Sequence, residues 1–248
     1  MRLTRVHVDG PLAPGMRLRL PEHAAAHLVR VLRLREGDAC VLFNGDGRDY
    51  AARLVATDKR GADVDISEST PVDNESPLRI VLLQGIARGE KMDLILQKAT
   101  ELGVAGIVPV FADRTEVRLD GERLDKRMAH WRSVVISACE QSGRARIPDL
   151  HPARALRDAA ASLPADAHRL TLDPEGTHRF ATLVLPRDAD ATTTVIIAIG
   201  PEGGWSDKDR MILADAGFHG LRLGPRVLRT ETAGLAAIAA LQAGFGDW

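Results

Sequence analysis

The chain has 248 residues, of which 45% are hydrophobic and 27% are charged, the composition of a soluble globular protein with one large or two smaller domains. The formal net charge of −1 provides no global attraction to nucleic acid, so a nucleic-acid partner would require a local basic patch. Aromatic residues make up only 4% of the chain, which argues against modules that stack RNA bases on aromatic side chains.

The sequence shows no sign of export or of a membrane span. No apolar run approaches the roughly 18–20 residues that cross a bilayer, and the N-terminus lacks the apolar core of a secretory signal. Cys40 and Cys139 lie far apart, and their neighbours show no metal-ligand spacing. We therefore expect free thiols, no bound metal and a cytoplasmic location.

Residues 1–70 predict a small β-barrel with one helix. Short segments rich in β-formers alternate with Gly, Asp and Asn at residues 2–9, 16–20, 38–45, 49–57 and 62–69. A helix is expected over residues 22–34, with Ala24, Leu28, Val31 and Leu32 at helical spacing. Residues 71–77, polar and without periodicity, predict a linker.

Residues 78–248 predict an α/β domain. Continuous apolar segments typical of buried strands occupy residues 78–86, 105–112, 168–173, 193–200 and 219–224. Amphipathic segments typical of helices occupy residues 90–103, 122–143, 153–163, 206–217 and 230–245, and Ser206 with Asp209 predicts a capping box. This alternation indicates a mostly parallel sheet.

Three loops after predicted strands carry unusual residues: 172–176 (LDPEG), 199–204 (IGPEGG) and 223–234 (LGPRVLRTETAG). Ligands of open α/β sheets bind at the carboxyl ends of the strands. In the second loop, Pro201 removes an N–H donor and Glu202 adds a charge that repels phosphate. The loop therefore favours a ligand that is neutral or cationic there, and S-adenosylmethionine fits better than ATP or a dinucleotide. The alternative is a plain strand-to-helix turn with a solvated Glu202.

The third loop places Arg226, Arg229, Thr230, Glu231 and Thr232 before an alanine-rich helix. Thr230 and Thr232 are both candidates for its N-cap, and Glu231 suits the helix dipole. Capping does not require two arginines, which are candidates for holding a substrate phosphate or for a solvated surface.

Four blocks of the sequence, "KMDLILQKATELGV", "EQSGR", "IGPEGGWSDKD" and "LGPRVLRTETAGLAAI", together resemble the RsmE-type ribosomal RNA methyltransferase family of the SPOUT superfamily. The resemblance spans almost the whole chain and implies a PUA-like RNA-binding barrel at residues 1–70 and a SPOUT methyltransferase domain at residues 78–248. It also implies a C-terminal trefoil knot and a homodimer, with methylation of N3 of a uridine in small-subunit ribosomal RNA. S-adenosylmethionine would be bound by Leu172, Asp173, Ile199, Gly200, Pro201, Glu202, Gly203, Gly204, Leu223, Gly224, Val227, Leu228, Thr230 and Thr232.

The chemistry of this reaction suggests catalytic candidates. Uracil N3 must lose its proton, so a base, or a group that stabilises the developing anion on the carbonyl oxygens, would accelerate transfer. Arg229 suits the second role, whereas Glu231 and Glu202 both remain candidates for the base. Ribosomal RNA would contact local basic residues, for which the candidates are Arg30, Arg33, Arg35, Arg88, Lys91, Arg114 and Arg144.

Two alternative functions remain open from the sequence. One is methylation of a ribose 2′-hydroxyl, a reaction of related SPOUT enzymes. The other is a non-catalytic RNA-binding assembly factor, which the intact "GPEGG" and "LRTETAG" blocks disfavour because a binder needs no cofactor pocket.

Overall fold

A computed structural model describes residues 3–58, 61–117, 119–176, 178–185 and 193–248, and the chain divides into two compact units. The first unit contains residues 1–75 and 136–147, and the second contains residues 76–135 and 148–248. The first segment ends at Glu75, within residues 71–77. The return of residues 136–147 to the first unit was not expected.

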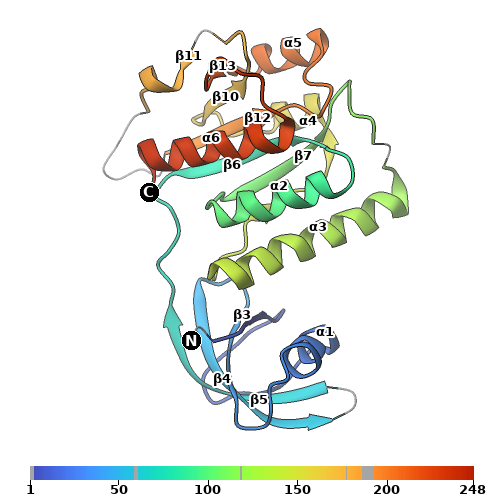
Figure 1. The fold of residues 1–248 in the computed structure, drawn as a ribbon, viewed down its shortest axis with the longest axis vertical. Coiled ribbons are helices and arrows are strands. Elements are labelled where there is room, and N and C mark those ends of the chain that lie inside the picture. Colours follow the sequence, from blue (N-terminus) through green and yellow to red (C-terminus); the bar gives the residue numbers. More distant parts are fainter. Residues whose placement is uncertain (1–2, 59–60, 118, 177, 186–192) are drawn as a thin grey trace. The chain divides into compact units, whose positions relative to one another are not determined.

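The first unit has a five-stranded sheet in the order β1-β3-β4-β5-β2, in which only the β1–β3 pair is parallel (Figure 1). Its strands are β1 (Arg5–His7), β2 (Arg17–Arg19), β3 (Ala39–Phe43), β4 (Arg48–Asp58) and β5 (Gly61–Pro71). Alternate strand residues are buried, among them Leu42, Leu54 and Val64, and Leu28 packs against them from the helical segment. The sheet has its hydrophobic core on this face.

The helical segment of the first unit differs from the uniform helix expected over residues 22–34. It begins as α1 (Glu22–Ala25) and continues as a π-helix, η1 (Ala26–Val31), in which the Leu32 N–H donates to the His27 oxygen at 3.0 Å. A π turn rotates the following residues away from the 3.6-residue stripe. Ala24 and Leu28 are therefore buried as expected, whereas Val31 is 65% exposed and Leu32 is 42% exposed.

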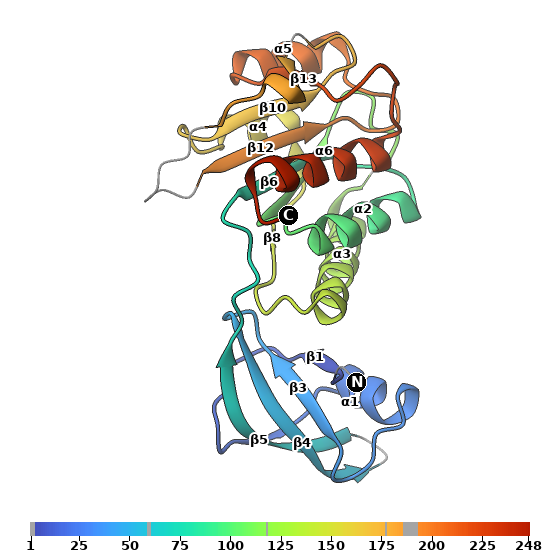
Figure 2. The ribbon, with the colours of Figure 1, turned by 60° about the vertical axis from the view of Figure 1, so that its left-hand side comes forward.

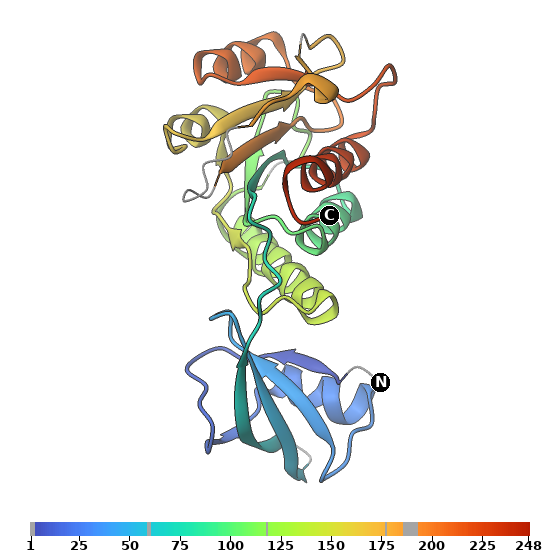
Figure 3. The ribbon, with the colours of Figure 1, turned by 90° about the vertical axis from the view of Figure 1, so that its left-hand side faces the viewer.

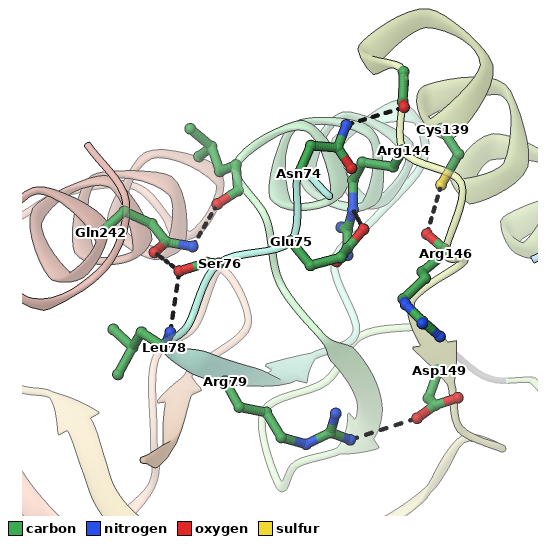
Figure 4. Close-up of polar contacts among 12 residues, drawn as sticks. Asn74, Glu75, Ser76, Leu78, Arg79, Cys139, Arg144, Arg146, Asp149 and Gln242 are labelled. Atoms are coloured by element: carbon green, nitrogen blue, oxygen red, sulfur yellow. Dashed lines mark hydrogen bonds and ion pairs between the residues drawn. The ribbon is translucent and has the colours of Figure 1, made fainter. Parts of the chain in front are cut away.

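Residues 136–147 belong to the first unit because polar contacts hold them there (Figure 4). Arg144 donates two hydrogen bonds to the Glu75 carboxylate, one of them at 3.0 Å, and Asn74 donates to the Gly143 oxygen at 3.0 Å. The Arg5 guanidinium donates to the Arg144 oxygen at 3.0 Å. Through these contacts, the segment "EQSGR" (residues 140–144) is held against Arg5, Asn74 and Glu75, which are distant from it in sequence.

The second unit has an eight-stranded parallel sheet, and its central order is β11-β13-β10-β12-β6-β7-β8, with β9 paired to β7. The strands are β6 (Arg79–Gly85), β7 (Gly106–Phe111), β8 (Asp149–Leu150), β9 (Arg154–Ala155), β10 (His168–Leu172), β11 (His178–Arg179), β12 (Thr194–Ile199) and β13 (His219–Arg222). The helices are α2 (Glu90–Glu101), α3 (Gly121–Ser142), α4 (Leu156–Ala161), η2 (Phe180–Thr182), α5 (Asp207–Asp215) and α6 (Thr230–Phe245), and the end of α3 from Ile136 belongs to the first unit. The expected parallel α/β sheet is confirmed.

Helices cover both faces of this sheet. Helices α2 and α6 lie together on one face, whereas α4 and α5 lie on the other (Figures 2 and 3). Leu83 and Ile196 pack with residues of α4 and α5, whereas Leu82, the residue before Leu83 on β6, lies near Gly234 of α6. Both faces are therefore apolar, which explains the continuous apolar strands. Within the described ranges, no helix combines the length and the apolar character of a membrane span.

Candidate functional site

Three loops meet at the carboxyl edge of the parallel sheet. Strand β10 lies between β12 and β13, so the loops that follow these three strands are neighbours. They enclose a pocket of about 560 Å³, a size suited to a small-molecule ligand. Its lining residues are Lys91, Arg114, Leu172, Asp173, Pro174, Ile199, Gly200, Pro201, Glu202, Gly203, Gly204, Trp205, Arg210, Leu221, Arg222, Leu223, Gly224, Arg226, Val227, Leu228, Arg229, Thr230, Glu231 and Ala233.

The Glu202 carboxylate fixes the second loop to the segment before α2. Its Oε1 accepts hydrogen bonds from the Arg88 backbone N–H at 3.0 Å and from Lys91 Nζ at 3.2 Å. Burial raises the pKa of Glu202, but the Arg88 N–H, its own backbone N–H and Lys91 outweigh that effect and lower the pKa below its usual value. Glu202 is therefore an anion with occupied acceptor sites, and a weak base.

Close backbone approach explains two glycines at this site. A Cβ on Gly85, at the end of β6, would lie 2.5 Å from the Pro201 nitrogen. A Cβ on Gly203 would lie 3.0 Å from the Arg114 Cβ, and the Arg114 guanidinium donates to the Gly203 oxygen at 3.0 Å. The second loop is thus packed against the end of β6 and against Arg114, which follows β7.

Thr230 does not cap helix α6 but links it to the second loop. The N-cap residue is Arg229, which makes no side-chain capping hydrogen bond. The Thr230 hydroxyl donates to the Gly200 oxygen at 2.6 Å and accepts from Gln84 Nε2 at 3.0 Å. Thr232 is exposed and does not line the pocket. The expectation that either threonine caps the helix is therefore wrong, whereas the Ser206–Asp209 capping box is confirmed.

Glu231 differs from Glu202 in its hydrogen bonding. Its Oε2 is buried and, in the part of the chain that the structure describes, has no hydrogen-bond partner. A buried carboxylate oxygen without a donor is costly. Because Glu231 also lines the pocket, it is a candidate to accept a hydrogen bond from a ligand. Arg229, two residues before Glu231, is exposed and also lines the pocket.

The pocket brings together thirteen of the fourteen residues expected at the cofactor site, and the exception is Thr232. Six pocket residues were not among the candidate site residues expected from the sequence: Pro174, Trp205, Arg210, Leu221, Arg222 and Ala233. Trp205 Nε1 donates to Thr171 Oγ1 at 3.0 Å, and Arg210 pairs with Asp173. Trp205 directly follows the glycine loop, so its position was a signal available in the sequence, whereas the long-range pairing of Arg210 was not.

The basic residues expected to bind RNA fall into two groups. Arg30, Arg33 and Arg35 are exposed in the first unit. Arg30 is in the last turn of η1, but Arg33 has a φ of 59° and lies beyond the helix, so these two residues do not share one helix, although the expected helix over residues 22–34 contains both. In the second unit, Arg88 pairs with Glu116 at 2.5 Å. Lys91 and Arg114 line the pocket.

Arg144 has a structural role instead of the expected contact with RNA. It is only 5% exposed, and its guanidinium is held by Glu75 within the first unit. A buried, paired guanidinium is not available to a phosphate group. In the described ranges, no group of three or more His, Cys, Asp or Glu residues is placed to hold a metal ion.

Family comparisons agree with this arrangement of site and units. An RNA methyltransferase domain model matches residues 74–242, and an RNA methyltransferase PUA domain model matches residues 20–67. These matches define the class of protein as an RNA methyltransferase. The chain belongs to the ribosomal RNA small subunit methyltransferase E family, since a member from Buchnera aphidicola (Schizaphis graminum) is 31% identical over 246 residues, which is 99% of this chain and 98% of that protein. A Bacillus subtilis member is 30% identical over 87% of this chain and 85% of its own length.

Two solved structures share the whole fold. A Neisseria gonorrhoeae ribosomal RNA small subunit methyltransferase E bound to S-adenosylmethionine is 41% identical, with a TM-score of 0.93 over 99% of both chains. A putative methyltransferase from Legionella pneumophila, in complex with the same cofactor, is 38% identical, with a TM-score of 0.94 over 100% of both chains. The N-terminal unit is accordingly PUA-like, and the C-terminal unit is the methyltransferase domain.

Proposed function

We propose that this protein transfers the methyl group of S-adenosylmethionine to N3 of a uridine in small-subunit ribosomal RNA. The single observation that carries the proposal is the pocket formed by the three loops, in a chain that matches cofactor-bound members of the family across its full length. The choice of N3 over a ribose hydroxyl rests on the family resemblance and on the Glu231 carboxylate, whose Oε2 has no hydrogen-bond donor in the described structure.

The residues of the pocket fit S-adenosylmethionine. The volume of about 560 Å³ suits a ligand of this size, and Leu172, Ile199, Trp205 and Leu223 provide apolar surface for an adenine ring. The carboxylate of Glu202 favours a positive charge nearby and disfavours a phosphate. When bound, the cofactor supplies an electrophilic methyl group on a positively charged sulfur.

Glu231 is the residue we assign as the base that accepts the N3 proton. Its buried Oε2 has an unused acceptor site in the described structure, and uracil N3–H is a donor. Glu202 is the weaker candidate, because Lys91 and the Arg88 N–H already occupy its Oε1 and its pKa is lowered. A base with a lowered pKa holds a proton poorly at neutral pH.

Arg229 is assigned to the charge that develops on the uracil carbonyl oxygens as the N3 proton leaves. Its guanidinium is always charged, and Arg229 lines the pocket two residues before Glu231. A fixed cation at this point lowers the energy of the anion without prior reorganisation of water.

The finer features of the family complete the proposal. We propose that the protein is a homodimer. We also propose a C-terminal trefoil knot, in which residues 223–229, between β13 and α6, cross the second loop. Support comes from the packing of α6 against β6 and β12 and from the exposed Leu94 and Trp248, which are 41% and 63% exposed in the same unit as α2 and α6. Light scattering on the purified protein tests the dimer, and a monomeric mass would refute it.

The experiment that tests the catalytic assignment measures binding and turnover separately. Isothermal titration should give S-adenosylmethionine binding to wild type, Arg229→Ala and Glu231→Gln with similar affinities. Single-turnover methylation of small-subunit ribosomal RNA should be slowed in both variants, because each substitution removes a group that acts only as the N3 proton leaves. Unchanged turnover in both variants would refute the assignment.

A further inference from the structure

The side chains of the pocket carry an excess of positive charge that the cofactor does not explain. Six cationic side chains line it, namely Lys91, Arg114, Arg210, Arg222, Arg226 and Arg229, against the three carboxylates Asp173, Glu202 and Glu231. The chain as a whole has a net charge of −1. A local basic patch of the kind that an RNA-binding protein of this composition requires is therefore present at the pocket.

The positive charge is divided unevenly within the pocket. Lys91 is paired with Glu202, Arg210 with Asp173, and Arg114 with the Gly203 oxygen. By contrast, the side chains of Arg222 and Arg226 have neither a hydrogen-bond nor an ion-pair partner among the residues described. Lys91, Arg114 and Arg210 thus stabilise the protein itself, whereas Arg222 and Arg226, in and after β13, remain available to bind an anion.

Another arginine, Arg179, lies next to Arg222 on β11, the edge strand of the sheet. Arg179 of β11 is the register partner of Arg222 of β13 in a parallel pair, so the two side chains project from the same face on neighbouring strands. Arg179 is exposed, and its guanidinium also lacks a partner in the described ranges. Two like charges side by side oppose folding unless an anion lies between or above them.

Arg226 is also open to a ligand. It is exposed in the loop, three residues before Arg229, the N-cap of the 16-residue helix α6. Val227, its neighbour, is 79% exposed, so this part of the loop is open to solvent.

We propose that Arg179, Arg222 and Arg226 form a phosphate subsite that holds the RNA backbone beside the target nucleotide. This inference rests on the proposed function. The cofactor has one carboxylate, which one arginine inside the pocket could satisfy, whereas Arg179 lies outside the pocket lining. A track of cations that runs from the pocket to the sheet edge fits a polymer with regularly spaced negative charges. The PUA-like unit, with Arg30, Arg33 and Arg35, would then provide a separate contact.

Binding measurements on full-length variants test the subsite. The probes are an in vitro transcript of small-subunit ribosomal RNA and S-adenosylmethionine, with Arg226→Ala, Arg179→Ala/Arg222→Ala and the control Arg123→Ala. Arg123 is exposed on α3 and does not line the pocket. For each RNA phosphate that a variant no longer neutralises, the slope of log K against log salt should become shallower by about 0.7 to 0.9. RNA affinity should fall about tenfold in low salt for the double variant. Cofactor affinity should be unchanged, and Tm should not fall, because the double substitution removes the repulsion between Arg179 and Arg222.

Each outcome bears on the subsite separately from the function. If wild type and the control bind RNA and the cofactor but the arginine variants keep the wild-type salt slope, the subsite is refuted and the function stands. If the variants lose cofactor affinity while RNA affinity is unchanged, the arginines bind the cofactor carboxylate and the subsite is again refuted. Failure of the wild type to bind either probe would instead refute the proposed function.

Discussion

The Thr230 hydroxyl donates a 2.6 Å hydrogen bond to the Gly200 oxygen and so joins the first residue of helix α6 to the loop after strand β12. The same hydroxyl accepts a hydrogen bond from the buried Gln84 side chain of strand β6. One hydroxyl therefore fixes three segments that are distant in sequence. Two of these segments form walls of the cofactor pocket, so the geometry of the pocket depends on this contact.

Thr230→Val should destabilise the second unit and weaken cofactor binding. Valine keeps the shape of threonine but removes the donor to the Gly200 oxygen and one of the two acceptors of Gln84 Nε2, the other being the Gly85 oxygen, which costs about 1–3 kcal/mol for buried groups. Urea unfolding and titration with S-adenosylmethionine measure the two effects. Thr232→Val is the matched control, because Thr232 is exposed and outside the pocket. Equal stability of the two variants would contradict the role of the Thr230 hydroxyl.

Gly85→Ala should be severely destabilising and should abolish cofactor binding. Its Cβ would lie 2.5 Å from the Pro201 backbone nitrogen, so the second loop would have to move. Gly224→Ala provides the comparison, because a Cβ at Gly224, also in the pocket wall, meets no atom within 4 Å. Its Tm should match wild type. A Gly85→Ala protein with wild-type Tm would show that the loop is not packed as described.

Glu202→Gln should change how stability depends on pH. The pKa of Glu202 is lowered in the folded state from the usual value of 4.5, so its contribution is present above that value and is lost as the pH falls further. The variant should therefore show a flatter decline of Tm in acid than wild type. Scanning calorimetry from pH 7 to pH 3 measures this difference. Parallel curves would mean that the Glu202 contacts with Lys91 and the Arg88 N–H contribute no stability.

Arg144→Ala should destabilise the first unit by about 3 kcal/mol, since it removes one partner of a buried ion pair. The estimate is at the low end of the usual range because Glu75 retains 26% exposure of its side chain. Arg17→Ala removes an ion pair with Asp65 in which both side chains are exposed, and should change stability little. Chemical denaturation of both variants tests the contrast, and similar stabilities would contradict a structural role for Arg144.

Cys40 and Cys139 should not react with thiol reagents in the folded protein. Burial raises the pKa of Cys40 to about 11 and that of Cys139 to about 12, so neither forms appreciable thiolate at pH 8. Titration with a chromogenic disulfide should detect no thiol before denaturant is added and two afterwards. Rapid reaction without denaturant would show that one of the thiols is accessible.

The sequence predicts well those features that depend on local pattern. The parallel sheet follows from continuous apolar strands such as Thr194–Ile199, and the capping box at Ser206 follows from the spacing of two polar residues. The three loops could be grouped in advance because the carboxyl ends of neighbouring parallel strands share an edge. Loops of this kind meet whenever their strands are adjacent, however far apart they lie in the chain.

Features that depend on long-range contacts could not be predicted. The π turn that exposes Val31 breaks the 3.6-residue period without an evident signal such as Gly or Pro within the segment. The sequence alone predicts that Arg144 is a surface cation, because its partner Glu75 lies 69 residues away in the chain. Glu202 and Glu231 are equivalent candidates in sequence, and only the hydrogen-bond partners of the former distinguish them.

Nucleoside mass spectrometry tests the central claim most directly. Purified wild-type protein and Glu231→Gln are each incubated with S-adenosylmethionine and small-subunit ribosomal RNA, and the RNA is digested to nucleosides. The account predicts 3-methyluridine from wild type and a strongly reduced yield from Glu231→Gln, with cofactor binding retained. A 2′-O-methylated nucleoside, or no methylated product on free RNA and on assembled small subunits alike, would contradict it.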